Sequence, residues 1–370
     1  MTAQGLLPGK VMKIFVLILI FSGLLLIIQD VVTVTETIVN RRAMKHVSVL
    51  IMHDALMASI VDPHTMFTGV NGFLEEHGKP AYFKLQLVGI SPQVKFHNAF
   101  SVNTDVLIDE VEKTDLIIIP AIGGDYKNTL KKNQEFIPWI VKQHEKGAEV
   151  ASLCSGAFML ASTGLLNGKE CSSHWNSAEL FREMFPEVTL MDGRIVTEYG
   201  GVYSSGGGAS YLNLLLHLIE KYVGREMAII ASKVFAIEID RKTQSPFVMF
   251  NGQKKHEDEP VRKAQEFIEQ NITEKISVEE LSLKFAINKR HFERRFKKAT
   301  NNTPSEYIQR VKIEAAKKKL ETSSMNVNEV MYEVGYSDVK NFRTVFKKIT
   351  GILPTDYRKK YNKQAAVHGN

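Results

Sequence analysis

The chain has 370 residues, 44% hydrophobic and 24% charged, which is an ordinary globular composition but too long for a single typical domain. Its two cysteines exclude a disulfide-stapled scaffold and are typical of a reducing compartment such as the cytosol. The net charge of +6 is uneven: residues 262–370 carry 23 Lys and Arg against 13 Asp and Glu, whereas the rest carries 24 against 28, so nucleic acid is expected as partner of the C-terminal part only.

Residues 1–43 form a hydrophobic N-terminal segment. Residues 14–28 carry no charge, but a membrane span needs about 20 residues, so the apolar run has to extend to residue 32 to cross a bilayer. A single-span anchor at 14–32, which would tether the protein to the inner membrane, is one interpretation. The other is that translation starts at Met44 and 1–43 is upstream sequence. A signal peptide is a weaker third, because no small-residue cleavage site follows.

From residue 44 to residue 235 the pattern alternates between strands and helices. Such alternation predicts a doubly wound α/β domain, in which ligands bind at the carboxyl ends of the strands. The predicted strands are His46–Met52, Lys84–Gly89, Asp115–Pro120, Glu149–Leu153, Arg194–Glu198 and Val202–Ser204. The predicted helices are Gln134–Lys146, Gly156–Ser162, Ser177–Phe185 and Tyr211–Val223.

One strand end is a candidate ligand pocket. The strand that ends at Leu153 leads into Cys154-Ser155-Gly-Ala, which predicts a strand-to-helix elbow that exposes the cysteine. A thiol at a helix N-terminus is expected to have a lowered pKa. Gly123 and Gly124 follow another strand and are expected to offer backbone N–H donors to the same crevice. His174 completes the predicted pocket.

These motifs resemble the PfpI-like superfamily, which has the class I glutamine amidotransferase-like fold. The resemblance covers residues 44–235 and is carried by Gly123-Gly124, Ala151-Ser-Leu-Cys154-Ser-Gly156, Leu160-Ala-Ser-Thr-Gly-Leu-Leu-Asn-Gly168, Ser173-His174-Trp175 and Ser204-Ser-Gly206. It implies that Cys154 occupies the nucleophile position and that His174 is its imidazole neighbour.

The catalytic set implied by this resemblance is incomplete. Active members of the superfamily place a carboxylate four residues before the proline of the first strand–helix loop. That proline is Pro63 here, and the position before it is Ser59, which cannot accept a proton as a carboxylate does. Asp62 lies at the wrong offset. Cys154, His174 and Ser59 are therefore interpreted as vestiges of a catalytic site, and a retained ligand pocket is favoured over a working enzyme.

Other motifs have plainer interpretations. Cys154 is alternatively a small buried hydrophobe, and His174 a hydrogen-bonded structural histidine. The glycines at 123–124 and 206–208 lack the Lys-Ser/Thr of a P-loop, so neither nucleotide nor another cofactor is expected. The histidines show no metal-ligand spacing. The run at 317–319, which is Lys-Lys-Lys, is typical of a solvated helix face.

Residues 236–260 change character and are predicted to link two domains. The polar end, Lys254 to Pro260, is a plausible linker tip. The stretch Gln244–Phe250 is too apolar for a free linker and is expected to pack on one of the domains.

The C-terminal part contains an internal repeat. Phe292-Glu-Arg-Arg-Phe296-Lys-Lys-Ala-Thr-Asn-Asn-Thr-Pro304-Ser-Glu-Tyr307 recurs fifty residues later as Phe342-Arg-Thr-Val-Phe346-Lys-Lys-Ile-Thr-Gly-Ile-Leu-Pro354-Thr-Asp-Tyr357, and seven of the sixteen positions are identical. A repeat at a fixed offset means one supersecondary unit built twice. In each copy the two Phe residues lie at i and i+4 on one helix face, and the opposite face carries Lys and Arg.

A shorter helix precedes each repeated helix. Ser277-Val-Glu-Glu280 predicts a capping box, Asn288 an N-cap, and Asn326 or Asn328 the start of the matching helix in the second copy. A short helix, a tight turn and a helix with a basic face make a helix-turn-helix unit.

Residues 261–361 resemble the AraC/XylS class of bacterial transcription regulators. That class has two helix-turn-helix units joined by a long helix, here the helix that contains Tyr307 to Leu320. Glu329-Val-Met-Tyr-Glu-Val-Gly-Tyr-Ser-Asp338, with the Phe, Gly and Pro that follow, matches the family signature. The chain departs from the pattern at Ala286 and Asn301, where glycine is usual, and at Met331, where a small residue is usual.

The exposed faces of the two repeated helices are the predicted DNA-binding surface. By the general code, Arg290, Arg294, Asn341 and Arg343 are expected to read bases, while most lysines contact phosphate. The complete predicted set is Lys289, Arg290, Glu293, Arg294, Lys297, Asp338, Lys340, Asn341, Arg343, Thr344 and Lys347.

Together the two resemblances point to regulators of the GlxA type. The function they imply is transcription regulation by a bacterial protein that binds double-stranded DNA, responds to a small-molecule effector in its α/β domain and forms a homodimer. The alternative is a cysteine-dependent amidase or hydrolase with an accessory basic domain.

Overall fold

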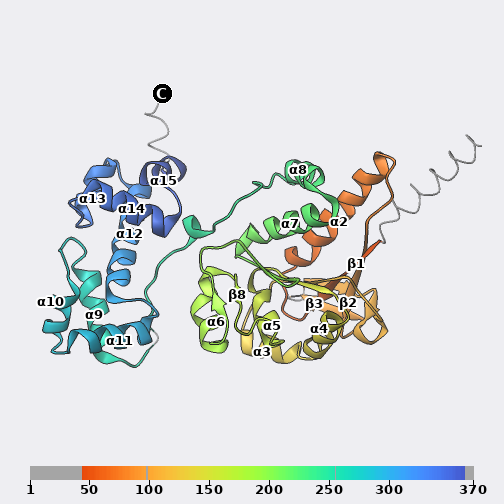
Figure 1. Ribbon diagram of the computed structural model, residues 1–370, viewed down its shortest axis with the longest axis horizontal. Helices are drawn as coiled ribbons and strands as arrows, with labels where there is room; N and C mark the ends of the chain where they lie inside the picture. The colour runs from red at the N-terminus through yellow and green to blue at the C-terminus, as the bar shows by residue number, and fades with distance from the viewer. Residues whose placement is uncertain (1–43, 97–98, 255, 363–370) are drawn as a thin grey trace, which may run out of the picture.

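The computed structural model describes residues 44–96, 99–254 and 256–362, which form an α/β domain followed by a helical domain (Figure 1). Among these residues no helix has both the length and the apolar character that crossing a membrane requires. The segment 1–43, and with it the anchor considered for 14–32, lies outside the described residues.

A seven-stranded sheet forms the centre of the α/β domain. Its order is β10-β11-β7-β6-β1-β2-β5, and neighbouring strands are parallel except β10 and β11. The strands are β1 (Lys45–Ile51), β2 (Phe83–Gly89), β5 (Val106–Leu107), β6 (Leu116–Ile119), β7 (Glu149–Ser152), β10 (Val196–Tyr199) and β11 (Val202–Ser205). Because β1 leads to β2 on one side and pairs with β6 on the other, the strand order reverses at β1, and the carboxyl ends of the strands at such a reversal are the expected place for a ligand.

Helices cover both faces of this sheet, so the expected doubly wound α/β architecture is confirmed. Figure 1 shows α2 (Ala58–Glu76), α7 (Tyr211–Val223) and α8 (Arg225–Val234) on one side, and α3 (Tyr126–Lys132), α4 (Phe136–Glu145) and α5 (Ala157–Ser162) on the other, with α6 (Ala178–Met184) beside α5. The central strand β6 is buried along its whole length, which explains its unbroken Leu-Ile-Ile-Ile sequence.

The predicted strands and helices of this domain are all present, with ends shifted by one or two residues. The sequence did not reveal several short strands, whose two to four residues are too few to show a periodicity: β3 (Gln93–Phe96), β4 (Phe100–Asn103), β5, β8 (Glu170–Cys171) and β9 (Thr189–Leu190). The expected location of Pro63 in a strand–helix loop is wrong, because Pro63 lies inside α2 and is buried.

The helical domain consists of two similar units, and this confirms the expected tandem arrangement. Its helices are α9 (Glu259–Gln270), α10 (Val278–Lys284), α11 (Lys289–Thr300), α12 (Pro304–Thr322), α13 (Val327–Glu333), α14 (Val339–Thr350) and α15 (Pro354–Tyr361). Each unit has its own apolar core. In the first, Phe296 packs edge-on against Tyr307 at 5.3 Å between ring centroids; in the second, Phe346 packs in the same way against Tyr357 at 5.5 Å.

The caps that the sequence predicts for these helices are present. Ser277 and Glu280 form a capping box at α10, and the side chain of Asn288 accepts a hydrogen bond at the start of α11. Asn326, not Asn328, is the N-cap of α13. At the far ends of α11 and α14, Asn301 and Gly351 both adopt the left-handed conformation that ends a helix.

The segment between α8 and α9 is held by both domains. Thr243 forms a β-bridge with Arg194 of the α/β domain. On the other side, the buried ammonium group of Lys317 in α12 donates to the carbonyl of Val248 at 2.6 Å. The solvated face expected for the Lys317–Lys319 run is therefore wrong for Lys317, because its amine serves to dock the linker.

The turns between the paired helices suggest a stability test. Ala286 has φ of +51°, whereas the equivalent residue of the second unit is Gly335 at +71°. A side chain in this left-handed region costs about 1 kcal/mol, so Ala286→Gly is expected to raise the free energy of unfolding of the helical domain by about that amount. Unfolding in urea followed by circular dichroism measures the change. Fluorescence provides an internal control, because Trp139 and Trp175, the only two tryptophans, both belong to the α/β domain.

The reverse change is expected to be harmful. A Cβ atom on Gly335 would lie 2.6 Å from the carbonyl oxygen of Thr273 and 2.8 Å from that of Ile272, so Gly335→Ala should destabilise the domain by more than about 2 kcal/mol. Equal and small effects of the two substitutions would contradict this account of the turns.

Candidate functional site

The cysteine elbow lies at the carboxyl end of β7. Cys154 has φ of +54°, an uncommon conformation for a residue with a side chain, and begins a short turn that runs into α5. Gly156 is needed at this turn, because a Cβ atom there would lie 2.5 Å from the carbonyl oxygen of Pro120. The Cys154 amide donates to the Ser205 hydroxyl at 3.0 Å, which fixes the elbow against β11.

Ser155 ties the elbow to the end of β6. Its hydroxyl donates to the carbonyl of Ile122 at 2.6 Å and accepts from the Ile122 amide at 3.0 Å. Because these bonds use both sides of the hydroxyl, Ser155 positions the two strand ends relative to each other. Its backbone also hydrogen-bonds to the Cys154 sulfur.

The thiol faces hydroxyl groups and a backbone donor that the sequence did not single out. The backbone of Gly208, in the loop after β11, hydrogen-bonds to the Cys154 sulfur. Tyr126 and Tyr211 are close enough to interact electrostatically with the thiol. The Tyr211 hydroxyl donates to the Asp62 carboxylate at 2.5 Å, so Asp62 belongs to this neighbourhood despite its unpromising offset in the sequence.

The lowered pKa expected for Cys154 is wrong. The side chain is 4% exposed, and burial raises its pKa, outweighing the hydrogen bonds from Gly208 and Ser155 that favour the thiolate. Burial raises the pKa of Cys171 further, to about 12. At neutral pH the elbow therefore carries a neutral thiol.

His174 is half-buried, and one of its ring nitrogens is already engaged in a local hydrogen bond. Its Nδ1 accepts a hydrogen bond from the Asn176 amide at 3.1 Å, so the ring caps the following turn. Burial lowers the pKa of His174, which keeps the imidazole neutral at pH 7. The ring packs against Gly207, where a Cβ atom would lie 2.3 Å from His174 Cδ2.

The two glycines after β6 contribute less to the crevice than expected. The Gly123 amide already donates to the carbonyl of Asp54 at 2.8 Å, so it is not a free donor, and the expectation is wrong for Gly123. Gly124 is exposed and has φ of +71°. The donor that the structure places at the thiol belongs instead to Gly208.

Ser59 has a structural function in this fold. Its hydroxyl donates to the carbonyl of Leu56 at 2.6 Å and accepts from the Ala121 amide at 2.9 Å. The side chain is buried, and both of its hydrogen bonds are to backbone groups. It joins the start of α2 to the end of β6.

The second candidate site is the outer face of α11. Phe292 and Phe296 are fully buried, and the opposite face is exposed. The exposed residues from the predicted set are Lys289, Arg290, Arg294 and Lys297, while Glu293 is half-buried. The amine of Lys297 donates to the carbonyl of Asn301 at 2.8 Å and so closes the helix end.

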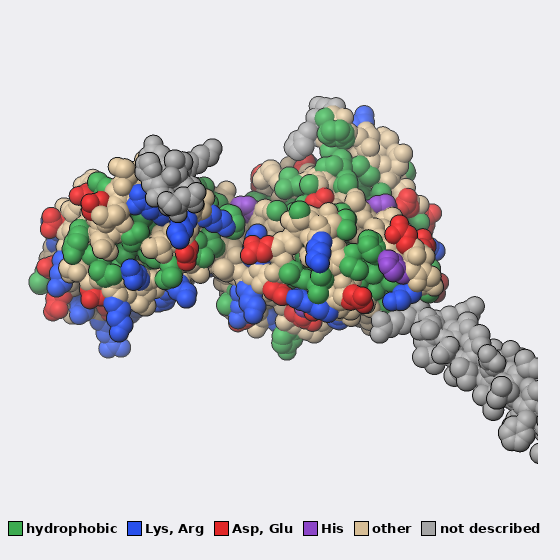
Figure 2. All heavy atoms as spheres, turned by 90° about the horizontal axis from the view of Figure 1, so that it is seen from above, with side chains coloured by type: hydrophobic (Ala, Val, Ile, Leu, Met, Phe, Trp, Pro, Cys, Tyr) green, Lys and Arg blue, Asp and Glu red, His purple; other side chains and the backbone are tan. Residues whose placement is uncertain are grey.

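The corresponding face of α14 carries the predicted residues Lys340, Asn341, Arg343, Thr344 and Lys347, all of them exposed. Asp338 differs, because its carboxylate is the N-cap of α14 and accepts from the Asn341 amide at 2.5 Å. His291, Lys298 and Lys348 are also exposed beside these residues. Helical periodicity could have revealed them. Figure 2 shows Lys and Arg side chains at several places on the visible face of the helical domain, interspersed with Asp and Glu.

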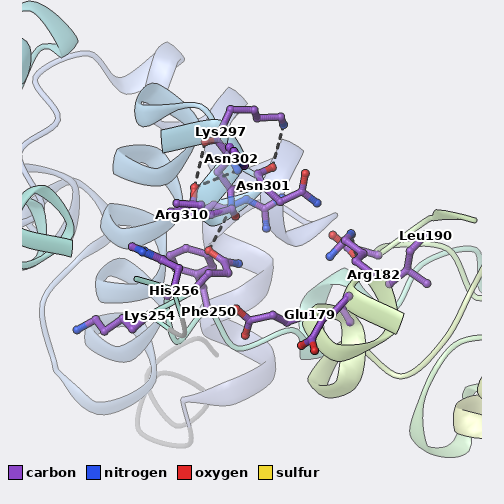
Figure 3. A pocket seen from close by; sticks show the side chains of 18 of the residues that line it. Glu179, Arg182, Leu190, Phe250, Lys254, His256, Lys297, Asn301, Asn302 and Arg310 are labelled. Atoms are coloured by element: carbon purple, nitrogen blue, oxygen red, sulfur yellow. Dashed lines mark hydrogen bonds and ion pairs between the residues drawn. The ribbon is translucent and has the colours of Figure 1, made fainter. Parts of the chain in front are cut away.

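A polar groove separates α6 from the first helix-turn-helix unit (Figure 3). Glu179 and Arg182 line it on the α6 side, and His256 and Arg310 on the other. Arg294 also borders this groove, so part of the outer face of α11 is turned towards the α/β domain. In the described ranges no group of His, Cys, Asp and Glu is arranged to hold a metal ion.

Comparison with known proteins supports the division into two domains. Residues 45–221 match the DJ-1/PfpI family, and residues 281–360 match a helix-turn-helix domain family. The HTH-type transcriptional regulator GbdR of Pseudomonas aeruginosa is 27% identical over 277 residues, which cover 72% of each chain. The HTH-type transcriptional regulator GlxA of Rhizobium meliloti is 23% identical over 289 residues, 76% of this chain and 87% of GlxA.

Among solved structures, an AraC family transcriptional regulator from Pseudomonas putida is similar to 52% of this chain and 99% of its own. Its TM-score is 0.44 and its identity 18%.

The chemistry of the elbow generates a prediction for alkylation. Because the thiolate is the reacting form, the rate of Cys154 with iodoacetamide is expected to be low at pH 7 and to rise about tenfold per pH unit up to at least pH 9. Cys171, buried and with the higher pKa, should react more slowly still at every pH. Mass spectrometry of the two cysteine peptides gives both rates. A Cys154 rate that is already at its plateau at pH 7 would contradict the raised pKa.

Proposed function

From a chain that joins a DJ-1/PfpI domain to an AraC-type helix-turn-helix domain, we infer a DNA-binding transcription regulator of the GlxA type. The observation that carries this conclusion is the duplicated unit of the helical domain. In both copies a buried aromatic pair orients a recognition helix so that its basic face points away from the core of its own unit.

We propose that α11 and α14 enter successive major grooves on one face of the DNA, about 34 Å apart. Arg290 and Arg294 of α11, and Asn341 and Arg343 of α14, are the proposed base readers. Arginine can donate two hydrogen bonds to guanine, and asparagine can pair in two positions with adenine. Lysines on the same faces, such as Lys289 and Lys347, supply phosphate contacts, which add affinity but little selectivity.

The proposed effector site is the cysteine elbow, at the carboxyl ends of β6 and β7. Cys154, Ser155, His174 and the loops at 123–124 and 207–208 border it. The groups near the elbow are neutral hydroxyls, backbone amides and an uncharged imidazole, together with one carboxylate, that of Asp62, which accepts from the Tyr211 hydroxyl. Such groups suit a small polar metabolite, and we propose one that contains nitrogen, in keeping with the amidotransferase-like ancestry of the domain.

We propose that this domain binds its effector without converting it. A thiol hydrolase needs a thiolate, or a base that can generate one. Here burial keeps the thiol of Cys154 protonated, the Nδ1 of His174 is committed to a backbone amide, and the carboxylate position is occupied by Ser59. These three features disfavour the alternative of a cysteine-dependent amidase.

Two further proposals concern assembly and location. Val61 of α2 and Ile229 and Val234 of α8 are exposed apolar side chains on two helices that contact each other, which supports self-association through this side of the α/β domain. A homodimer would place two helical domains on neighbouring half-sites. Because its target is chromosomal DNA, we place the protein in the cytoplasm.

DNA readout is tested by the double substitution Arg290→Ala/Arg343→Ala in the full chain. Loss of two base-reading arginines is expected to weaken binding to a selected site by at least about tenfold, since each such contact is worth about 1–3 kcal/mol. Titrations on fragments upstream of the protein's own gene, repeated across a salt series, measure the affinity and its selectivity.

The matched control for this experiment is Arg262→Ala/Lys263→Ala. It removes the same charge from exposed positions of α9, outside the two recognition helices. Equal losses in the two double variants would mean that binding depends on net charge alone, which argues against base readout.

Effector binding is tested by protection of the elbow. A panel of amine, amide and guanidine metabolites is screened for a shift in the thermal unfolding of tryptophan fluorescence, which reports the α/β domain. A compound that binds at the elbow is expected to slow the alkylation of Cys154 in proportion to its occupancy and to leave Cys171 unaffected. Thermal stabilisation without protection of Cys154 would place the effector elsewhere.

A further inference from the structure

A single glutamine of the linker is buried inside the α/β domain. The side chain of Gln244 is 0% exposed, although it belongs to the segment between the domains. Its Oε1 accepts from the Gly207 amide at 2.9 Å. Its Nε2 donates to the carbonyl groups of Ser173 and Asp192, both at 3.0 Å. The backbone amide of Gln244 donates to the carbonyl of Gly193 at 2.9 Å.

The α/β domain has two glycines where the linker enters. A Cβ atom on Gly206 would lie 2.9 Å from the Gln244 amide group, and one on Gly193 would lie 2.7 Å from the Ser245 hydroxyl. Gly206 does not have a positive φ, so backbone conformation does not require glycine there. The space that it leaves is filled by the glutamine side chain.

The partners of Gln244 are also the neighbours of Cys154. Gly207, which donates to Gln244, is followed by Gly208, which hydrogen-bonds to the thiol. Ser173, which accepts from Gln244, donates from its hydroxyl to the carbonyl of Cys154 at 3.3 Å. The glutamine therefore holds two of the backbone segments that border the elbow.

On its other side the same stretch of linker packs on the second helix-turn-helix unit. A Cβ atom on Gly351, at the end of α14, would lie 3.1 Å from Thr243 and 3.8 Å from Pro246. Four residues beyond Gln244, the Val248 carbonyl accepts from Lys317. Only a few residues separate Gln244 from these contacts. A displacement of Gln244 would therefore also shift the linker residues that contact α12 and α14.

We propose that Gln244 is a positioning residue for the effector site and couples its occupancy to the placement of the second recognition helix. The effector changes the position of the Gly207–Gly208 loop, whose amide at Gly207 donates to Gln244. The linker shifts together with Gln244. This inference rests on the proposed effector site, which it deepens by naming the connection between that site and α14. Energetic coupling of this kind requires one element that both sites contact, and the Gln244 segment meets that requirement.

The effect of Gln244→Ala is measured on the full chain without DNA or effector, so that its outcome does not depend on the regulator assignment. Two readouts are taken together: the iodoacetamide rate at Cys154, and amide hydrogen exchange in peptides that cover 207–210 and 347–351. Loss of the glutamine is expected to speed alkylation of Cys154 about tenfold, because one net hydrogen bond is worth about 1 kcal/mol. It is also expected to raise hydrogen exchange in both peptides.

Matched variants separate this coupling from a general loss of structure. In Gly206→Ala the added methyl group occupies the space of the Gln244 amide and displaces it. This variant should therefore also speed alkylation of Cys154 and raise exchange in both peptides. Met249→Ala alters an exposed side chain of the same linker and should reproduce neither. Global unfolding is followed by circular dichroism rather than by Cys171, because Cys171 lies two residues before Ser173, which accepts from Gln244. If Gln244→Ala lowers the helical signal, the milder Gln244→Met, which removes only the hydrogen bonds, replaces that variant.

The proposal is overturned if Gln244→Ala and Gly206→Ala change the peptide 207–210 but leave 347–351 as in the unsubstituted chain, since the glutamine would then act locally. It is also overturned if both variants leave Cys154 and both peptides unchanged. Failure of the proposed function gives another result. Gln244→Ala would still change both peptides, but the DNA titrations would show no selective binding.

Discussion

The middle of the linker is anchored to both domains by buried polar groups, and the relation between the halves of the molecule depends on this constraint. Gln244 enters the α/β domain, and Lys317 of α12 reaches back to the linker at Val248. A buried amide or ammonium that loses its partners is costly, because no water replaces the lost hydrogen bonds. The two anchors are four residues apart, so movement of one domain bears on the other.

The electrostatics of the elbow keep its thiol in the neutral form. The positive φ of Cys154 and the adjacent strand ends preserve the shape of a nucleophile elbow. Burial nevertheless raises the pKa of the thiol, and the imidazole of His174 is neutral and engaged with its own backbone turn. The groups that hydrogen-bond to the sulfur are those of Ser155 and the backbone of Gly208, and none of them is a base.

Much of this structure could be predicted from the sequence, because the relevant signals are local. The capping box at Ser277, the left-handed end of α11 at Asn301 and the apolar run of β6 each depend on a few neighbouring residues. The duplicated Phe pairs gave the tandem helix-turn-helix arrangement directly. Boundaries and short strands were less certain, since two to four residues carry almost no periodicity.

The rest depends on contacts between residues far apart in the chain. Asp62 meets Tyr211 and Gln244 meets Gly207 only after the sheet has formed, and no spacing rule connects them. The pKa of Cys154 was misjudged for the same reason: the helix that follows it is local and visible in the sequence, whereas the burial of the thiol arises only in the folded domain. Lys317 was expected to be solvated. The sequence could not reveal its partner, because the carbonyl that it contacts belongs to Val248 in the linker, 69 residues away.

The central claim is that the two basic faces of the helical domain read DNA together. The measurement that tests it most directly is a hydroxyl-radical footprint of the full chain on a selected fragment upstream of its own gene. The account predicts two protected patches on the same face of the duplex, about one helical turn apart, that persist when competitor DNA is in excess. A uniform, sequence-independent protection that disappears as salt is raised would contradict it, because counterion release alone would then explain the binding.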